Sequence, residues 1–180
     1  MKLKLSPLER VLLINQFEIR KAVEKNKHDV EWFEEMIEVL ERGYEAYYSQ
    51  LTDRFSSFAE EDSRFVVDVL DMYRCIEDYK VAHPNDVEVA EAPYSFFFGF
   101  DGNNEAQHLG FVRFLFEKKE LWKEQAKYAE KTDDYNNHMP TLDTYGRMLA
   151  KFKSFGEHVT KLSHDQVLAV LAEAKHPANK

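Results

Sequence analysis

Two Glu-x-x-His pairs are the residues whose types and spacing point most directly to chemistry. Glu105 and His108 stand three positions apart, and so do Glu173 and His176. On a helix this spacing places both side chains on one face, and two such pairs supply four of the six ligand residues of a carboxylate-bridged di-iron site. The site would also need glutamates on the apolar faces of two further helices, and His176 directly precedes Pro177, where a helix ends. A di-iron carboxylate enzyme therefore stands only as an alternative.

The segment "DGNNE" resembles the first half of a calcium-binding loop. Asp101, Asn103 and Glu105 suit the first, third and fifth ligand positions of an EF-hand. Ala106 replaces the required glycine, however, and Val112 stands where the bidentate glutamate is needed. Asp, Gly and Asn are good N-caps, and an acidic residue in a first turn suits the helix dipole. The segment therefore predicts the start of a helix and no calcium site.

Other catalytic signatures are absent from the sequence. It contains no phosphate-binding glycine-rich loop, no Gly-x-Ser-x-Gly and no His-Glu-x-x-His. The single cysteine, Cys75, lies on the flank of an apolar helical stripe, which favours a small, partly buried residue over a nucleophile. We therefore predict no catalytic residue, no metal and no cofactor, and the sequence favours a non-enzymatic role.

The composition restricts the partners of the protein. The chain has 180 residues, 44% of them hydrophobic, and a net charge of -9. An acidic chain is repelled by nucleic acid phosphates and by anionic lipid, so we predict neither a direct nucleic-acid partner nor a membrane surface. One cysteine cannot form an internal disulfide, and the N-terminus lacks a long apolar run. We therefore expect a cytoplasmic protein without a signal peptide or a membrane span.

Apolar residues recur at helical spacing along nearly the whole chain, and only six glycines and five prolines interrupt them. This pattern predicts an all-α protein, a single multihelical domain over residues 1–180 with about six or seven helices. The first helix begins in "SPLE", where Ser6 and Glu9 form a capping box. Asn15 lies in the middle of the apolar face of that helix, so we expect it to be buried and bonded to another helix. The other members of this face are Leu8, Val11, Leu12, Ile19, Ala22 and Val23.

Further helix boundaries follow from capping residues. Asp29 is predicted to cap the second helix, and Gly43 to end or kink it. Ser57 with Glu60, and Ser163 with Gln166, have the spacing of capping boxes, each before a further helix. On the helix after Ser57, the acidic residues, Glu77 among them, are assigned to the solvent side. A further helix is expected to run from the phenylalanine-rich stretch to about residue 128, and a polar loop follows it.

The aromatic run "YSFFFGF" has two interpretations. Its rings either pack in the core or form a patch that faces a partner, because aromatic residues are favoured in the centres of interfaces. The interface candidates are Phe96, Phe97, Phe98 and Phe100.

Four segments resemble the YfbU family of bacterial proteins. They are "LSPLERVLLINQFEI", "IEVLERGYEAYYSQL", "RFVVDVLDMYR" and above all "FFFGFDGNNEAQHLGFVRFLFEK". Their order and spacing fit as well, over roughly residues 6–22, 36–55, 63–76 and 97–118. The resemblance implies an all-α, multihelical, cytoplasmic and oligomeric protein, and it supplies no reaction.

The resemblance also points to polar positions inside these blocks. The candidates for a ligand contact or for a structural role are Asn15, Arg42, Tyr44, Asp101, Glu105 and Arg113. A carboxylate such as Asp101 or Glu105 is the expected partner of Arg113. The leading hypothesis is a protein that associates with itself, as a homo-oligomer, or with an unknown protein partner. The alternative is a helical pocket for a small ligand or a metal, lined by Arg113, Asp101, Asn15 and Tyr44.

Overall fold

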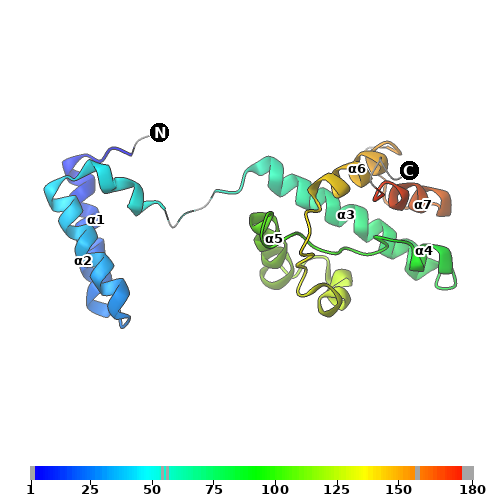
Figure 1. Ribbon diagram of the computed structural model, residues 1–180, viewed down its shortest axis with the longest axis horizontal. Helices are drawn as coiled ribbons and strands as arrows, with labels where there is room; N and C mark the ends of the chain where they lie inside the picture. Colours follow the sequence, from blue (N-terminus) through cyan, green and yellow to red (C-terminus); the bar gives the residue numbers. More distant parts are fainter. Residues whose placement is uncertain (1–2, 54, 56, 157–158, 176–180) are drawn as a thin grey trace. The chain divides into compact units, whose positions relative to one another are not determined.

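A computed structural model describes residues 3–53, 55, 57–156 and 159–175. These residues form seven α-helices with short 3-10 and π segments, and the described residues contain only one isolated β-bridge, between Phe100 and Asn136. The predicted all-α class is confirmed. Contacts gather in two compact units, residues 1–57 and 58–180, and each is described by itself (Figure 1). A single domain over the whole chain stays a prediction.

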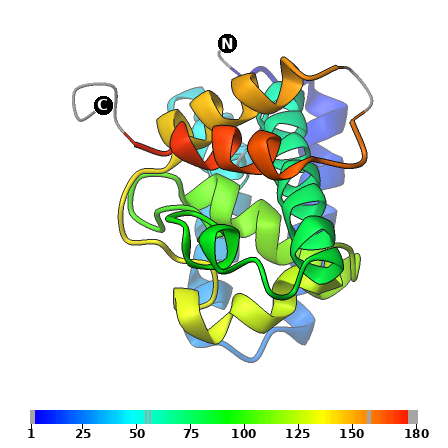
Figure 2. The ribbon, with the colours of Figure 1, turned by 90° about the vertical axis from the view of Figure 1, so that its right-hand side faces the viewer.

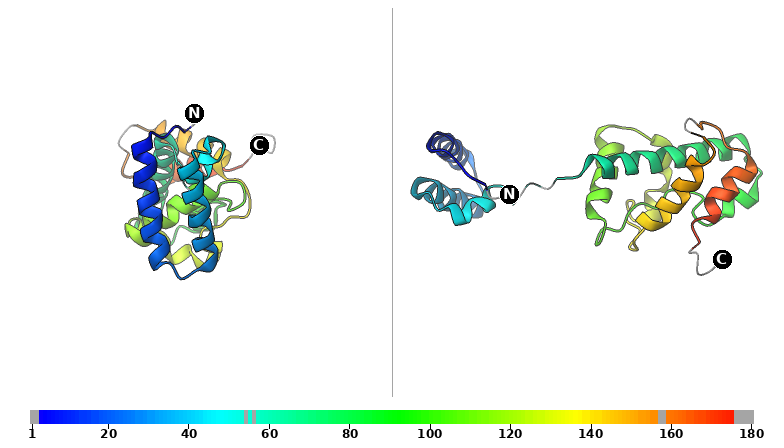
Figure 3. Two further views of the ribbon diagram at one scale, coloured as in Figure 1. Left: turned by 90° about the vertical axis from the view of Figure 1, so that its left-hand side faces the viewer. Right: turned by 90° about the horizontal axis from the view of Figure 1, so that it is seen from above.

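Unit 1 is a helical hairpin followed by a short 3-10 segment. Helices α1 (Pro7–Val23) and α2 (Lys27–Arg42) lie side by side, and Glu45–Leu51 forms the 3-10 turns (Figure 3). The capping box of Ser6 and Glu9 opens α1 as predicted. The side chain of Asn26, rather than Asp29, caps α2. Gly43 ends α2 with a φ of 70°, a left-handed conformation that glycine adopts without steric cost.

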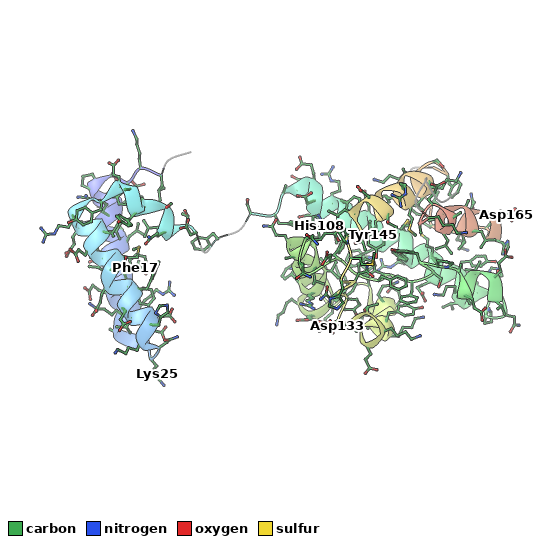
Figure 4. All side chains as sticks on the ribbon, viewed as in Figure 1. Phe17, Lys25, His108, Asp133, Tyr145 and Asp165 are labelled. Atoms are coloured by element: carbon green, nitrogen blue, oxygen red, sulfur yellow. The ribbon has the colours of Figure 1, made fainter. Side chains whose placement is uncertain are left out.

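The core of unit 1 is small. Phe17 is the buried residue of α1, and its ring lies 5.5 Å from that of Trp32 and 5.7 Å from that of Phe33 on α2 (Figure 4). Leu13 and Ile14 pack beside it. The side of α1 that faces α2 is therefore not the side that its apolar pattern predicted. Asn15 is exposed, so the prediction that it is buried is wrong.

Unit 2 is organised by the long helix α3 (Glu60–Ala82), which contacts both α5 (Ala106–Arg113) and α6 (Leu142–Lys153). Helix α7 (His164–Ala172) lies beside α6, and the short α4 (Val87–Glu91) contacts α7 (Figure 2). Ala59 occupies the N-cap of α3, so the predicted capping box of Ser57 and Glu60 is wrong. The box of Ser163 and Gln166 at α7 is confirmed.

The phenylalanine-rich stretch does not begin one helix that reaches Tyr128. The helix α5 is eight residues long, and Phe114–Lys118 continues it as a π-helix. Two 3-10 segments follow, Lys123–Tyr128 and Glu130–Thr132. Between them and the π-helix, Glu120 and Trp122 have φ of 53° and 48°. A positive φ is incompatible with a right-handed helix, so the chain turns there.

Candidate functional site

The residues selected from the sequence are divided between the two units. Asn15, Arg42 and Tyr44 are exposed residues of unit 1. Tyr44 and Tyr47 line a groove of about 250 Å³ against α2, together with Glu35, Glu38 and Val39. Asp101, Glu105 and Arg113 belong to unit 2. The candidates therefore form two groups, one in each unit.

Glu105 is a buried acceptor that joins the start of α5 to the start of α6. Its Oε1 accepts hydrogen bonds from the backbone N–H of Thr141 at 2.7 Å and of Leu142 at 2.9 Å. Its Oε2 accepts from the Thr141 hydroxyl at 2.9 Å and from the Asp101 N–H at 3.0 Å. The carboxylate thus satisfies N–H groups at the beginning of α6, which has no side-chain cap of its own.

Asp101 holds the turn that precedes α5. Its carboxylate accepts from the Asn104 side-chain amide and from the Asn103 N–H, and these two bonds lower the pKa of Asp101 below its ordinary value. The predicted N-cap position of α5 is occupied by Glu105 and not by Asp101. Both residues are buried, and their oxygens are used by donors from the same chain. Their geometry is that of structural carboxylates.

The predicted Glu-x-x-His pairs do not make a metal site in the described residues. His108 lies against the rings of Phe58 and Phe100, at centroid distances of 5.0 Å and 5.3 Å, while the oxygens of Glu105 face N–H and hydroxyl donors. His176 lies outside the described residues. No group of three or more His, Cys, Asp or Glu residues is placed to hold a metal ion in residues 3–175 where the structure describes them.

Arg113 pairs with Asp134, so the predicted partnership with Asp101 or Glu105 is wrong. The Arg113 Nε lies 2.8 Å from a carboxylate oxygen of Asp134, and an Nη donates to the Asp134 carbonyl at 2.9 Å. Asp101 and Glu105 accept from other donors of unit 2, whereas Asp134 offers both a carboxylate and a backbone carbonyl oxygen to the guanidinium. The ligand pocket expected around Asp101 and Arg113 is thus not formed by these two residues.

Backbone hydrogen bonds join the segment before Asp101 to the loop before α6, at residues 135–137. The Phe100 N–H donates to the Tyr135 carbonyl at 3.0 Å, and the Asn137 N–H donates to the Phe100 carbonyl at 3.2 Å. The Tyr145 hydroxyl, in the interior of unit 2, donates to the Gly99 carbonyl at 3.0 Å (Figure 4). Gly99 has a φ of 90°, which favours glycine.

Of the predicted interface aromatics, Phe97 and Phe100 are fully buried in the core of unit 2. Burial excludes both from a surface contact of the folded unit, which corrects that part of the prediction. Phe96 and Phe98 are half-buried, stack on each other at 4.3 Å and retain some exposed surface. The core interpretation therefore holds for Phe97 and Phe100, whereas Phe96 and Phe98 stay partly exposed.

An apolar stripe on α1 is the other feature that stands out. The side chains of Leu8, Val11, Leu12, Ile19 and Val23 are 68%, 52%, 56%, 59% and 75% exposed. With Asn15 among them, they recur every three or four residues, so they share the face of α1 opposite to Phe17. We call these five apolar residues the α1 stripe. Large apolar side chains gathered on one exposed face are characteristic of a contact surface.

The comparison with known proteins identifies the family. The model of the YfbU domain matches residues 3–173. The chain belongs to the YfbU family. A curated relative, UPF0304 protein MJECS11 of Methanocaldococcus jannaschii, is 39% identical over 169 residues, which are 93% of this chain and 98% of the relative. The YfbU match spans both compact units, so the α1 stripe and the Glu105 contacts both lie within the family domain.

This YfbU-family chain also contains a buried charged cluster that the sequence did not reveal. Glu77 of α3 is 2% exposed and accepts from the Lys127 Nζ and the Tyr128 hydroxyl, each at 2.6 Å, and from Lys80. Lys80 also donates to the Ser95 carbonyl at 3.0 Å. The prediction that Glu77 lies on the solvent side of its helix is therefore wrong. The lysine and tyrosine that cover it come from a segment about fifty residues later, and no local pattern announces them.

The titration of Glu77 reflects these contacts. Burial by itself would raise the pKa of the Glu77 carboxyl, but the hydrogen bonds from Lys127, Lys80 and Tyr128 together outweigh it, so the pKa lies below its ordinary value of 4.5. Burial also lowers the pKa of Lys80, against the attraction of Glu77, so both pKa values fall: the charged form is favoured for Glu77 and disfavoured for Lys80. Because several donors converge on the one carboxylate, its ionised form is the state that the fold requires.

We expect Glu77→Gln to destabilise unit 2 by about 3 kcal/mol at neutral pH, because it leaves the half-buried Lys80 and the buried Tyr128 hydroxyl without the carboxylate that they face. Because the pKa of Glu77 is lower in the folded state, its ionised carboxylate stabilises the folded state above pH 4.5. This contribution is lost as the pH falls through the pKa of the folded state. The variant should therefore lose less stability than the native chain on going below pH 4.5. Urea unfolding across this pH range measures the difference, with the adjacent exposed Asp78→Asn as control. If the free energy of unfolding fell equally with pH below 4.5 for the native chain and for the Glu77 variant, this assignment would be contradicted.

A larger groove lies on α3 beside residues 160–162. It has a volume of about 410 Å³, and Cys75, Tyr79, His83 and Lys161 are among its lining residues. The Cys75 thiol is buried and lies 3.6 Å from the Val159 carbonyl. Burial raises the pKa of this thiol, which disfavours the nucleophilic thiolate.

No described helix is both long enough and apolar enough to cross a membrane.

Proposed function

We propose that this chain is a non-enzymatic cytoplasmic protein that acts by associating with itself through the α1 stripe. The observation that carries the proposal is the exposure of five large apolar side chains on one face of one helix, each more than half exposed. Covering such a side chain stabilises an assembly by about 1.5–3 kcal/mol for complete burial. The single cysteine, which leaves no internal disulfide, supports the cytoplasmic assignment.

The small size of unit 1 supports the same proposal. Its core has seven buried apolar residues, whereas the core of unit 2 has twenty-three. Helical units of fewer than about 70–80 residues rarely bury enough apolar surface by themselves and commonly gain the rest by association. Unit 1 contains no cysteine, so no disulfide bond holds this hairpin together. An apolar contact on the outer face of α1 would supply the missing burial.

The structural use of the polar residues in unit 2 also favours association over catalysis. Glu105 and Asp101 hold backbone and side-chain donors of the same chain, and Arg113 holds the loop at Asp134. These groups stabilise the fold in their present contacts. The α1 stripe, in contrast, lies on the face of α1 opposite to the core of unit 1, and its five apolar side chains stay exposed on that unit.

The proposal is tested with the double variant Leu12→Asp/Ile19→Asp. Both positions are exposed, so the charges should leave the helix content unchanged, while in an apolar interface they should weaken association at least about 100-fold. Sedimentation velocity over a concentration series measures this, and circular dichroism verifies the helices. Val81→Asp is the matched control, because Val81 is equally apolar and 75% exposed but lies on α3. A native chain that sediments as a monomer at micromolar concentration would overturn the proposal.

A further inference from the structure

The arrangement of the α1 stripe indicates which partner covers it and in which orientation. We propose that two copies of this chain pair through α1, with the two helices antiparallel about a two-fold axis close to Asn15. This inference rests on the proposed self-association and adds its geometry. It names a second copy of the same chain as the occupant of the stripe.

The stripe matches itself when one copy is reversed. Asn15 stands at its centre, with Leu8 seven residues before it and Val23 eight residues after it. Leu8 and Val23 lie 7.5 residues, and Leu12 and Ile19 lie 3.5 residues, on either side of the midpoint between Asn15 and Gln16. An antiparallel pair therefore places Leu8 beside Val23 of the second copy and Leu12 beside Ile19. Such self-complementarity is what a two-fold interface between identical chains requires.

Unit 2 does not offer a comparable surface. Its large exposed apolar side chains among the described residues are distributed over separate elements and connections: Val81 on α3, Val87 on α4, Phe114 on the π-helix, and Leu121 and Met139 outside helices. None of these elements presents a row of such residues that would match a helix with five of them. Among the described residues, the apolar surface whose length and spacing match the α1 stripe is the α1 stripe of a second copy.

Electrostatics favours the antiparallel orientation over the parallel one. A parallel pair in register would set each residue beside its own copy, so that Glu18 on the flank of the stripe would face a second Glu18. It would also bring like ends of the two helix dipoles together. In the antiparallel pair, the negative end of each helix lies beside the positive end of the other. Glu18 keeps its ion pair with Lys21, at 3.0 Å, in either orientation.

Asn15 acquires a role in this arrangement. Its amide is exposed in one chain, and it interrupts an otherwise apolar face. At the two-fold axis, two Asn15 side chains meet, and each amide can both donate and accept, so they satisfy each other. A polar residue at one position of an apolar helical seam selects a single register, because any shift would bury the amide against apolar side chains. Asn15 is thus proposed as the residue that fixes the register.

Site-specific cross-linking in the full chain tests the geometry. Cys75→Ala removes the native thiol, and single cysteines are then introduced by Asn15→Cys, Leu8→Cys or Val23→Cys. A short bis-maleimide should cross-link Asn15→Cys with itself. It should join Leu8→Cys to Val23→Cys in a mixture of the two, one of which carries a size tag, and it should leave Leu8→Cys alone uncross-linked. Gel analysis measures the yields, and sedimentation of the same samples gives the association state.

The outcomes separate the two proposals. Samples that associate in the sedimentation experiment but cross-link Leu8→Cys to itself indicate a parallel pair and overturn the antiparallel geometry alone. Association without cross-linking at Asn15→Cys places another surface in the contact and also overturns it. Samples that remain monomeric overturn self-association itself. Efficient cross-linking of Asn15→Cys and of the Leu8→Cys and Val23→Cys mixture, with none for Leu8→Cys alone, supports the pairing described.

Discussion

Gly99→Ala is expected to unfold unit 2 or to destabilise it by at least about 4 kcal/mol, among the largest effects of a single substitution. A Cβ at this position would lie 1.7 Å from the Tyr135 carbonyl oxygen and 2.2 Å from its carbon. Those atoms are backbone, and the same carbonyl accepts the Phe100 N–H, so they cannot move aside without breaking that bond. The φ of 90° would add strain for any residue with a side chain.

The matched control is Gly110→Ala, the same change eleven residues later. Nothing lies within 4 Å of a Cβ built at Gly110, which is inside α5. Alanine is preferred over glycine inside helices, so this variant should gain about 0.5–1 kcal/mol. Urea unfolding followed by Trp122 fluorescence in a Trp32→Phe background reports unit 2 alone, because Trp32 belongs to unit 1. Equal stabilities for the two variants would contradict the assignment of Gly99.

Glu105→Gln has the second largest expected effect, a loss of about 3–5 kcal/mol from unit 2. Each carboxylate oxygen accepts two hydrogen bonds, from Thr141 and Leu142 on one side and from Asp101 and Thr141 on the other. A glutamine must turn its NH2 group toward one of these pairs, where donor would face donor. The buried N–H groups left without an acceptor then carry their full desolvation cost.

The same unfolding experiment measures Glu105→Gln, with Glu91→Gln as the control. Glu91 is an exposed glutamate at the end of α4, so its neutralisation should change the stability by less than about 0.5 kcal/mol. The double variant Glu105→Gln/Thr141→Val adds a further check. Since the two side chains share one hydrogen bond, the effects of the two substitutions should not add. Additive losses, or a Glu105 variant as stable as the native chain, would refute the structural role of this carboxylate.

The capping motifs were predictable because their bonds are local. Ser6 with Glu9 and Ser163 with Gln166 meet within one helical turn, so the residue types and their spacing are sufficient. Gly43 ends α2 by its own conformational freedom. Asp29 and Ser57 show the limit of the same reasoning, since neighbouring residues took the cap positions. Helix boundaries are decided by competition between adjacent candidates of similar energy.

The candidate site residues depended on partners far away in the sequence. Glu105 bonds with residues thirty-six and thirty-seven positions later, and Arg113 with a residue twenty-one positions later. Glu77 is covered by Lys127 and Tyr128. No periodicity records such contacts, and therefore the charged cluster at Glu77 was missed and the partner of Arg113 was assigned wrongly.

The sequence by itself determined the helical class, two capping boxes, the glycine stop of α2 and the apolar face of α1. Each of these depends on bonds or spacings within a few residues, which a sequence displays directly. The tertiary structure alone decided that α1 faces α2 with Phe17 and leaves its apolar stripe exposed, and that Glu105 joins α5 to α6. Which face of a helix is covered depends on what packs against it, and that is a property of contacts between distant segments rather than of the helix itself.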